Sequence, residues 1–487
     1  MHCISLIFGF SNENIYIYLV SHFFSIMLTL ALIGILIYVI AENQHPVQTL
    51  AWVLVIVFLP VVGLILYFLI GHRPTRKRLL PQEERQALKS HSRQSPSRRQ
   101  PEELTPPYRR LATLMQEMNL AYPLSGNAVK PYFGFYAMFE DLLSDLEQAR
   151  DHIHFQFFKF EDDPVGRRVA DLLIRKAAEG VKVRVQYDDA ANYLRKGFYH
   201  RLRKAGIEVE PFIKIRLPFL SDSSNYRNHR KVVVIDGRIG YLGGMNIAQR
   251  YGTGLDWGTW RDDHIRIEGP AVAELQTSFL TDWQFSSKRF VDGSEYYPKV
   301  QSSGFVTMQI LTAGPFDEWR VIMQGIIRAI TRSERYVFIQ SPYFIPTEPV
   351  MLALRNAALA GIDVRVMIPY RGDRGVIVPL ASMSYVEEAL TAGVKVALYR
   401  KGYMHSKTIV SDDAFVTVGS TNVDVRSYEL DFEINAFIYD EDLAVRARDI
   451  FLEDEQFCEY LDLEAWRARS RRQKFRESFA RTFSPLL

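Results

Sequence analysis

Two short motifs in the chain repeat with the same spacing. In each, a lysine lies two residues after a histidine, an aspartate five residues after the lysine, and an asparagine ten residues after the aspartate. The candidate catalytic residues are His229, Lys231 and Asp236 in the first motif and His405, Lys407 and Asp412 in the second; the candidate phosphate-binding residues are Asn246 and Asn422. One such pattern arises by chance on the order of 10⁻⁵ times per chain. Two copies in register therefore indicate a duplicated site.

The residue types of each motif suit an anionic phosphoryl group. Lysine and asparagine donate hydrogen bonds to phosphate oxygens, and an imidazole can attack phosphorus or carry a proton. A single such pair on a strand would more often be a surface feature. If the two motifs face each other across a pseudo-twofold axis, two imidazoles flank one phosphate, so that one can be the nucleophile and the other the general acid.

The sequence around each motif predicts a β-hairpin that presents these side chains. Residues 231–244 and 407–420 read as paired strands with Asp-Gly or Asp-Asp at the turn. Because side chains alternate along a strand, the histidine and lysine share a face. Asp236 and Asp412 face the other side, and we expect them to be structural. We expect the glycines after the turn to let the backbone approach a ligand closely.

The elements that must carry the hairpins also occur twice. In each half a strand, a helix and a second strand precede the motif, and the repeat unit is roughly 180 residues long. The expected strands are 152–158, 181–187, 336–344 and 362–370, and the expected helices are 165–180 and 348–361. The fold class is therefore α/β, with a first domain at 108–304, a second at 305–487 and one core in each.

Two apolar runs without charged residues precede these domains, at 19–40 and 49–70. Each has roughly the 20 residues that a helix needs to cross a membrane. The short link between them predicts a tight turn, so residues 1–71 are expected to form a two-helix transmembrane hairpin, with Pro60 as a tolerated kink. A cleaved signal peptide is the alternative for the first run, disfavoured because no lysine or arginine precedes it.

A basic, polar segment at 72–107 follows and is expected to be a flexible linker. Its cationic residues close to the second apolar run are Arg73, Arg76, Lys77 and Arg78. By the positive-inside rule they place the catalytic domains, and with them the N-terminus, in the cytoplasm. They could also hold anionic lipid headgroups.

The composition excludes several classes of protein. The 59 lysines and arginines against 56 aspartates and glutamates leave a net charge of +3, too small for general binding of nucleic acid. Two cysteines, Cys3 and Cys458, cannot build a disulfide framework or a cysteine zinc site. The chain has no common metal or P-loop motif, so we expect no metal and no other cofactor, with the two lysines in the electrostatic role of Mg²⁺.

On these motifs the chain resembles the phospholipase D superfamily and, within it, the bacterial cardiolipin synthases. The double apolar run and the stretches WRDDHIRIEGPAV (260–272), SPYFIP (341–346) and STNVDVRS (420–427) extend the similarity over nearly the whole chain. The resemblance implies two phospholipase D-like domains related by a pseudo-twofold axis. It also implies that Asp263 and Glu433 orient the imidazoles; the alternative is that both are exposed strand-edge carboxylates.

The resemblance implies a reaction as well: reversible phosphatidyl transfer between two phosphatidylglycerol molecules, giving cardiolipin and glycerol through a phosphohistidine. We expect His229 as nucleophile and His405 as acid, although these roles could be exchanged. The expected partners are phosphatidylglycerol and anionic membrane lipid, not nucleic acid, at the bacterial inner membrane. The oligomeric state stays open. Alternatives are a membrane-bound phospholipase D that transfers to water, a nuclease of the superfamily and an inactive lipid-binding scaffold.

Overall fold

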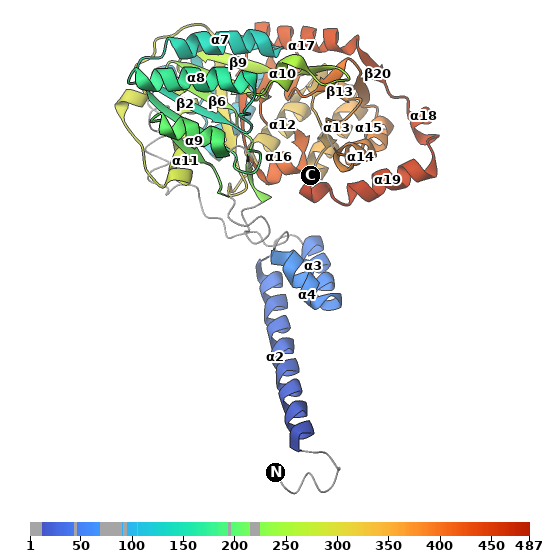
Figure 1. Ribbon diagram of the computed structural model, residues 1–487. Coiled ribbons are helices and arrows are strands. Elements are labelled where there is room, and N and C mark those ends of the chain that lie inside the picture. Colours follow the sequence, from blue (N-terminus) through green and yellow to red (C-terminus); the bar gives the residue numbers. More distant parts are fainter. Residues whose placement is uncertain are drawn as a thin grey trace. The chain divides into compact units, whose positions relative to one another are not determined.

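The computed structural model describes residues 12–42, 46–68, 90, 95–104, 106–192, 196–214, 225–373 and 375–487. They belong to two compact units, an apolar helical unit at 12–68 and an α/β unit that holds nearly all described residues from 90 onward (Figure 1). The predicted linker at 72–107 lies largely outside the described residues, and so do Arg73, Arg76, Lys77 and Arg78.

The apolar unit is built on one long helix, α2 (Asn12–Glu42). Its 27 residues from Tyr16 to Glu42 are the part of the described chain that is long and apolar enough to cross a membrane. At about 1.5 Å per residue this length exceeds the roughly 30 Å of bilayer hydrocarbon. Two shorter helices, α3 (Pro46–Phe58) and α4 (Pro60–Leu66), follow it.

The second apolar run is not one continuous helix. We expected Pro60 only to bend this helix, but the helix ends before it. Proline lacks a backbone N–H, and its ring collides with the preceding turn. Leu59 leaves the helical conformation at φ −133°, and α4 folds back on α3, with Gly63 so close to Val55 that a Cβ at 63 would lie 2.7 Å from the Val55 carbonyl oxygen. The unit thus has one apolar helix of spanning length and a shorter apolar helix, α3.

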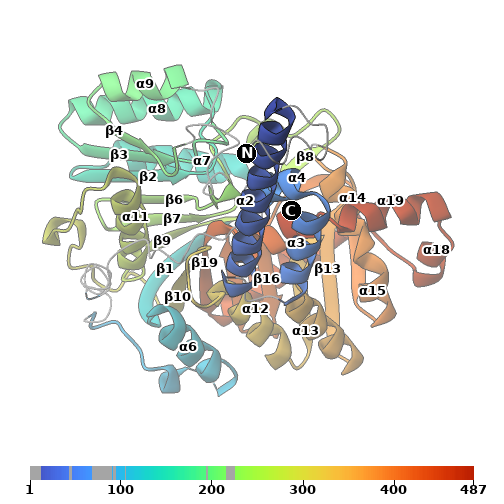
Figure 2. The ribbon, with the colours of Figure 1, turned by 90° about the horizontal axis from the view of Figure 1, so that it is seen from below.

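The α/β unit repeats one strand order in its two halves. The first half runs β4 (Glu208–Pro211), β3 (Lys182–Tyr187), β2 (His152–Phe157), β6 (Val232–Ile235), β7 (Ile239–Gly243), β9 (His264–Glu268), β1 (Leu124–Tyr132). The second runs β14 (Lys395–Tyr399), β13 (Asp363–Pro369), β11 (Tyr336–Gln340), β16 (Thr408–Ser411), β17 (Phe415–Gly419), β19 (Asp431–Tyr439), β10 (Val306–Ala313), and β20 (Cys458–Tyr460) pairs with its β14 edge. Because β1 and β10 pair antiparallel, the two sheets are continuous (Figure 2).

Helices cover this double sheet and, among the described residues, form its three largest apolar cores. The first half has α7 (Phe135–Glu147), α8 (Pro164–Ala178), α9 (Lys196–Lys204) and α11 (Val272–Ser287); the second has α12 (Val321–Arg332), α13 (Glu348–Leu359), α14 (Ile377–Ser384), α15 (Val386–Thr391) and α17 (Glu441–Glu455). Each half has a core of its own, and a third core joins α11 and α17 through strands of both halves. The prediction of one core per copy missed this shared core.

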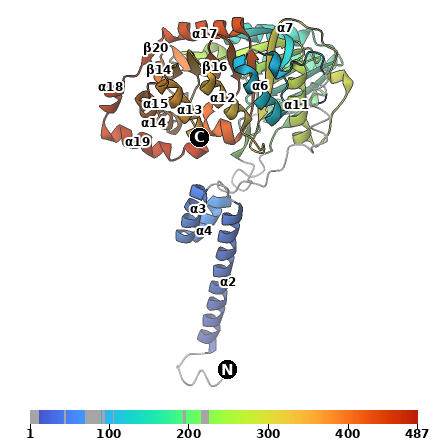
Figure 3. The ribbon, with the colours of Figure 1, turned by 180° about the vertical axis from the view of Figure 1, so that it is seen from behind.

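Helix α6 (Pro106–Asn119) precedes the first half in sequence but packs in the core of the second. Tyr108 stacks on Phe415 at 5.6 Å between ring centroids, and the Asn119 side chain donates to the Thr312 carbonyl at 3.0 Å. Figure 3 shows α6 beside α12. The expected boundary at residue 108 thus falls inside a helix that serves the other half.

The remaining elements are short and lie mainly around the site and the C-terminus. They are α10 (Arg250–Thr253), α16 (Val425–Glu429), α18 (Leu463–Arg467), α19 (Arg471–Arg481), β5 (Arg227–Asn228), β8 (Thr259–Arg261), β12 (Phe344–Ile345), β15 (Gly402–Met404), β18 (Val423–Asp424) and the 3₁₀ turns η2 (Pro101–Glu103), η5 (Ser294–Tyr296) and η6 (Ser484–Leu486).

Both predicted hairpins are confirmed, as β6–β7 and β16–β17. Their motif aspartates begin the turns with φ of 52° at Asp236 and 55° at Asp412. The Asp236 carboxylate accepts three backbone N–H bonds of 2.8–2.9 Å at the start of β2, and Asp412 accepts three of 2.8–3.1 Å at the start of β11. Although they stand among the candidate catalytic residues, both tie a hairpin to the neighbouring strand, at the hairpin end remote from the histidine.

Replacing Asp236 or Asp412 by asparagine should therefore destabilise the protein and leave its chemistry nearly intact. In Asp236→Asn the new amide group faces the Arg150 N–H that Oδ2 accepted, so one bond becomes a clash of two donors, at a cost of about 1–3 kcal/mol in the free energy of unfolding. Denaturant unfolding and turnover of the folded fraction measure the two effects. Asp256→Asn, at an exposed loop position, is the control. An unchanged stability with a hundredfold loss of turnover would contradict this assignment.

Candidate active site

Two short strand pairs cross between the halves and hold the motif histidines. β5 pairs parallel with β19, and β15 pairs parallel with β8. Beyond these pairs the His229 N–H donates to the Phe432 carbonyl at 2.9 Å, and the His405 N–H donates to the Arg261 carbonyl at 2.7 Å. The backbone of each histidine is thus positioned by the opposite half.

Each imidazole also bonds a carboxylate of the opposite half. Nδ1 of His229 lies 3.0 Å from Oε1 of Glu433, and Nδ1 of His405 lies 2.6 Å from Oδ2 of Asp262. Both carboxylates are buried. A carboxylate on Nδ1 orients the ring and leaves Nε2 as the atom available for chemistry.

Asp262, and not the expected Asp263, is the counterpart of Glu433. Asp263 pairs with Arg261 and accepts a 2.6 Å bond from the Thr408 hydroxyl. The strand register explains the difference: His264 lies opposite Gly243, and Asn435 lies opposite Gly419, so the residue two before each is Asp262 or Glu433. The spacing from the motif asparagine differs between the halves, so counting along the sequence does not reveal the match.

The glycine at 244 makes room for this carboxylate, not for a ligand as expected. A Cβ at position 244 would collide with the carboxylate oxygens of Asp262. Ser420 occupies the equivalent place in the second half, where its hydroxyl donates to Oε2 of the longer Glu433 side chain. The residue after each hairpin thus fits the acid beside it: Gly244 leaves room for Asp262, and Ser420 forms a hydrogen bond with Glu433.

The motif lysines lie within the same buried cluster. Lys231 Nζ donates to the His229 carbonyl at 2.5 Å, while Lys407 Nζ donates to the His405 carbonyl and lies 2.9 Å from His405 Nδ1. Burial lowers the pKa of both lysines, and that of Lys231 falls to about 7.

The charges of each motif act on the titratable groups of the other motif. Burial, reinforced by the ammonium groups of both lysines, holds the pKa of His229 and of His405 well below the usual value, so that both rings are neutral near pH 7. Burial raises the pKa of Asp262, and it raises that of Glu433 to about 7. The structure therefore brings the two histidines and two lysines into one site.

The motif asparagines are buried but are held differently. The Asn246 amide donates to the Tyr251 hydroxyl at 2.6 Å and accepts from the Lys159 N–H at 2.9 Å. The Asn422 amide donates to Asp424 at 3.0 Å. Each amide nitrogen has a second hydrogen that it can offer to a phosphate oxygen.

Aromatic rings frame the two imidazoles unequally, a feature that the motifs did not reveal. The Phe158 ring meets His229 edge-on at 5.0 Å, whereas Tyr251, Trp260 and Tyr403 surround His405 at 5.1–5.8 Å between ring centroids. Trp260 begins the sequence stretch that also contains Asp262. This proximity in sequence was the one signal that could have placed Trp260 at the site. Within the described ranges, no group of three or more histidine, cysteine or acidic side chains is arranged to hold a metal ion.

Gly244→Ala should impair catalysis through Asp262. Because the methyl group takes the place of the carboxylate, the Nδ1 contact of His405 is lost, and turnover should fall by about 10²-fold or more, as when an orienting acid is removed. Steady-state turnover and thermal melting should be measured together. Gly134→Ala is the matched control, since a Cβ there meets nothing within 4 Å. Normal turnover in folded Gly244→Ala protein would refute the orienting role of Asp262.

Comparisons with known proteins identify the family of the chain. The family model described as "Cardiolipin synthase, PLD-like domain" matches residues 142–283 and 326–455, and "Phospholipase_D-nuclease N-terminal" matches 26–72. The chain is 40% identical to the major cardiolipin synthase of Bacillus subtilis over 481 residues, which cover 96% of this chain and 99% of the relative. It is 37% identical to a cardiolipin synthase of Listeria monocytogenes, with 96% and 100% covered.

Among solved structures, the phosphatidylserine synthase of Haemophilus influenzae has the same fold, with a TM-score of 0.59 at 14% identity over 78% of this chain and 100% of that one. The family model matches the chain twice, once in each half of the duplicated sheet. The chain therefore belongs to the cardiolipin synthase family of the phospholipase D superfamily.

Proposed function

We propose that the protein transfers a phosphatidyl group from one phosphatidylglycerol to the terminal hydroxyl of a second, which yields cardiolipin and free glycerol. The observation that carries this proposal is the crossed pairing of two neutral imidazoles, each held at Nδ1 by an acid of the opposite half. Such a pair can run a two-step displacement at one phosphorus atom. The names of the full-length relatives support the same product.

In the first step Nε2 of His229 attacks the phosphorus of the donor lipid. The bond from phosphorus to the glycerol oxygen breaks, and His405 gives its Nε2 proton to that oxygen, so glycerol leaves as a neutral alcohol. The Lys407 ammonium, 2.9 Å from Nδ1 of His405, gives a proton to that nitrogen, so the ring stays neutral. The phosphatidyl group is then bonded to His229. Glu433, at 3.0 Å from Nδ1, stabilises the positive charge that develops on this ring.

In the second step the terminal hydroxyl of another phosphatidylglycerol gives its proton to Nε2 of His405, and the Nδ1 proton of this ring returns to Lys407. Its oxygen attacks phosphorus, the phosphorus–nitrogen bond breaks, and His229 returns to its starting state. One phosphodiester is consumed and one is formed at each turnover. The reaction is therefore close to thermoneutral, and added glycerol should drive it backwards.

The surroundings of the two rings favour these roles over the reverse. Nδ1 of His229 faces a carboxylate, an arrangement that keeps the proton on Nδ1 and the lone pair on Nε2. Nδ1 of His405 contacts the Asp262 carboxylate at 2.6 Å in the same way, but it also has the Lys407 ammonium at 2.9 Å. His405 thus has a proton source beside Nδ1 that His229 does not have at its own Nδ1, so it can give up its Nε2 proton as a general acid and stay neutral.

The other motif residues balance the charge on the phosphoryl oxygens. Lys231 and Lys407 supply two ammonium groups from a buried site, and Asn246 and Asn422 each offer an amide hydrogen. Loss of one such donor typically removes about 3–4 kcal/mol of transition-state stabilisation.

Helix α2 would anchor the enzyme in the membrane that contains its substrates, so that the search for two lipids takes place on a surface. We infer that this is the bacterial inner membrane, with the catalytic domains on the cytoplasmic side. The basic residues after the apolar runs support that side. A hairpin of two spans would require α3 and α4 to rearrange into one helix on insertion. The division into 1–71, 72–107, 108–304 and 305–487 remains part of this proposal.

Alanine variants of the two histidines should separate the two steps. His229→Ala and His405→Ala should each lose synthesis, because neither ring can replace the other within one cycle. With a phosphatidyl donor whose leaving group needs no protonation, His405→Ala should accumulate label on His229, detectable by mass spectrometry of its peptides. Lipid analysis for cardiolipin against phosphatidic acid distinguishes transfer to lipid from transfer to water. Label on His405 in His229→Ala protein would exchange the roles.

The pH dependence of kcat/KM should be a bell with its maximum near pH 7. The pKa of Glu433, raised to about 7, means that its carboxylate is lost as pH falls through that value. The pKa of Lys231, lowered to about 7, means that its ammonium is lost as pH rises through it. Lys231→Arg, which stays charged, should keep the acid limb and lose the alkaline limb. A wild-type profile that is flat from pH 5.5 to 8.5 would contradict the need for both charges.

A further inference from the structure

Helix α19 lies far along the chain from both motifs. Its acidic residue faces the protein interior, and its phenylalanines face solvent. Its inward face holds Glu477 and Ala480, both buried. Glu477 accepts from Arg469 at 2.6 Å and from Gln473 at 3.2 Å. The single acid of the helix is therefore paired inside the protein and contributes no negative charge to the outer surface.

The outer face of α19 presents aromatic rings to solvent. Phe475 is 70% exposed and Phe479 is 58% exposed, and residues four apart share a helix face. Phe483, just beyond the helix, is also exposed and packs edge-on against Phe479 at 5.5 Å. We call Phe475, Phe479 and Phe483 the α19 patch. Exposed aromatic clusters of this kind mark interaction sites.

Cations surround the α19 patch. The helix carries five basic residues, Arg471, Arg472, Lys474, Arg476 and Arg481, and one acid, Glu477, so its formal charge is +5 − 1 = +4. Arg471, Arg472 and Arg476 are exposed. A helix with phenylalanines and arginines on its outer face has the composition of helices that lie in the headgroup region of anionic membranes.

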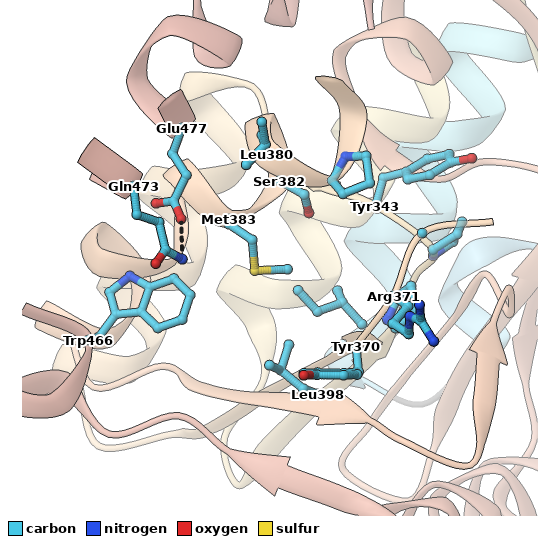
Figure 4. A pocket seen from close by; sticks show the side chains of 15 residues that line it. Tyr343, Tyr370, Arg371, Leu380, Ser382, Met383, Leu398, Trp466, Gln473 and Glu477 are labelled. Atoms are coloured by element: carbon cyan, nitrogen blue, oxygen red, sulfur yellow. Dashed lines mark hydrogen bonds between the residues drawn. The ribbon is translucent and has the colours of Figure 1, made fainter. Parts of the chain in front are cut away.

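The inner side of α19 closes an apolar cavity of about 370 Å³ (Figure 4). Trp466, Gln473 and Glu477 line one end, Met383 and Leu380 of α14 lie in the middle, and Tyr343 lies at the other end. Tyr343 neighbours Tyr403, whose ring lies 5.7 Å from that of His405. The cavity therefore extends from α19 towards the active site, and the Tyr343 and Tyr403 side chains lie between it and His405.

We propose that the α19 patch docks on the surface of an anionic bilayer, as a membrane contact separate from α2. The phenylalanines enter the headgroup region and the arginines bind lipid phosphates, which brings the α19 end of the cavity to the lipid. This contact goes beyond the proposed chemistry, because it would hold equally if the two histidines exchanged roles.

Spin labels on the full-length protein test the contact directly. With Cys3 and Cys458 replaced by serine, Phe475→Cys and Phe479→Cys are labelled with a nitroxide and reconstituted in vesicles of phosphatidylglycerol and phosphatidylcholine. For each label we compare relaxation by oxygen, which concentrates in the bilayer, with relaxation by a water-soluble nickel chelate. The ratio of oxygen to nickel relaxation should be at least about threefold higher at 475 and 479 than at Ser144→Cys, an exposed position on α7. In phosphatidylcholine alone, or at high salt, the difference should shrink.

Two results of that measurement overturn the proposal. One is a ratio at 475 and 479 equal to that at Ser144 in the phosphatidylglycerol vesicles. The other is strong spin–spin broadening in detergent without a bilayer, which would assign the patch to a second copy of the chain. Neither result depends on catalysis, so failure here is distinct from failure of the proposed reaction.

Activity gives an independent measurement. The Phe475→Ser/Phe479→Ser variant should raise the apparent KM for phosphatidylglycerol in vesicles at least about fivefold and leave kcat on detergent-dispersed substrate unchanged. Phe305→Ser is the matched control, because Phe305 is 96% exposed on a segment remote in sequence from α19, and it should leave both constants unchanged. An unaltered KM in the double variant, or an equal rise in the control, overturns the proposal.

Discussion

The active site depends on two hydrogen bonds that cross between the halves of the α/β unit, from His229 to Glu433 and from His405 to Asp262. Each histidine lies at the end of a strand that pairs with the opposite half, so neither half contains a complete imidazole–carboxylate pair. The continuous sheet at β1 and β10 makes this exchange possible, because it fixes the two hairpins relative to each other. Duplication of the domain therefore supplied the geometry of the site, in addition to a second set of residues.

Burial is what makes these groups reactive. Two lysines, two histidines and two acids are removed from water within one region, and isolated charges there would be very unfavourable. Burial lowers the pKa of the amines and raises that of the acids, and the attraction between the opposite charges offsets part of both shifts. An anionic phosphodiester completes this arrangement, since it provides a counter-charge for both ammonium groups. The charges of the site therefore favour the binding of an anionic group between the two lysines.

Much of the fold and of the site could be predicted from the sequence, for a physical reason. The hairpins and the flanking strands and helices follow from the alternation of side chains along strands and from the 3.6-residue period of helices. The pairing of the two histidine motifs follows from their identical spacing in the two halves. The partner of His405 could not be predicted, because the choice between Asp262 and Asp263 depends on strand register across β7 and β9. The break at Pro60 was also missed, since hydropathy measures apolar content and not continuity of the backbone. The shared central core needs contacts between residues far apart in the chain, which no local pattern contains.

The placement of α6 has a consequence for biosynthesis. This helix leaves the ribosome roughly 300 residues before Phe415, on which its Tyr108 stacks. At about 5–20 residues per second, that interval lasts on the order of 15 to 60 seconds. During this time the apolar face of α6 has no core to enter, although the first half can already begin to fold. The nascent chain therefore carries an amphipathic helix whose apolar face stays uncovered until synthesis is nearly complete.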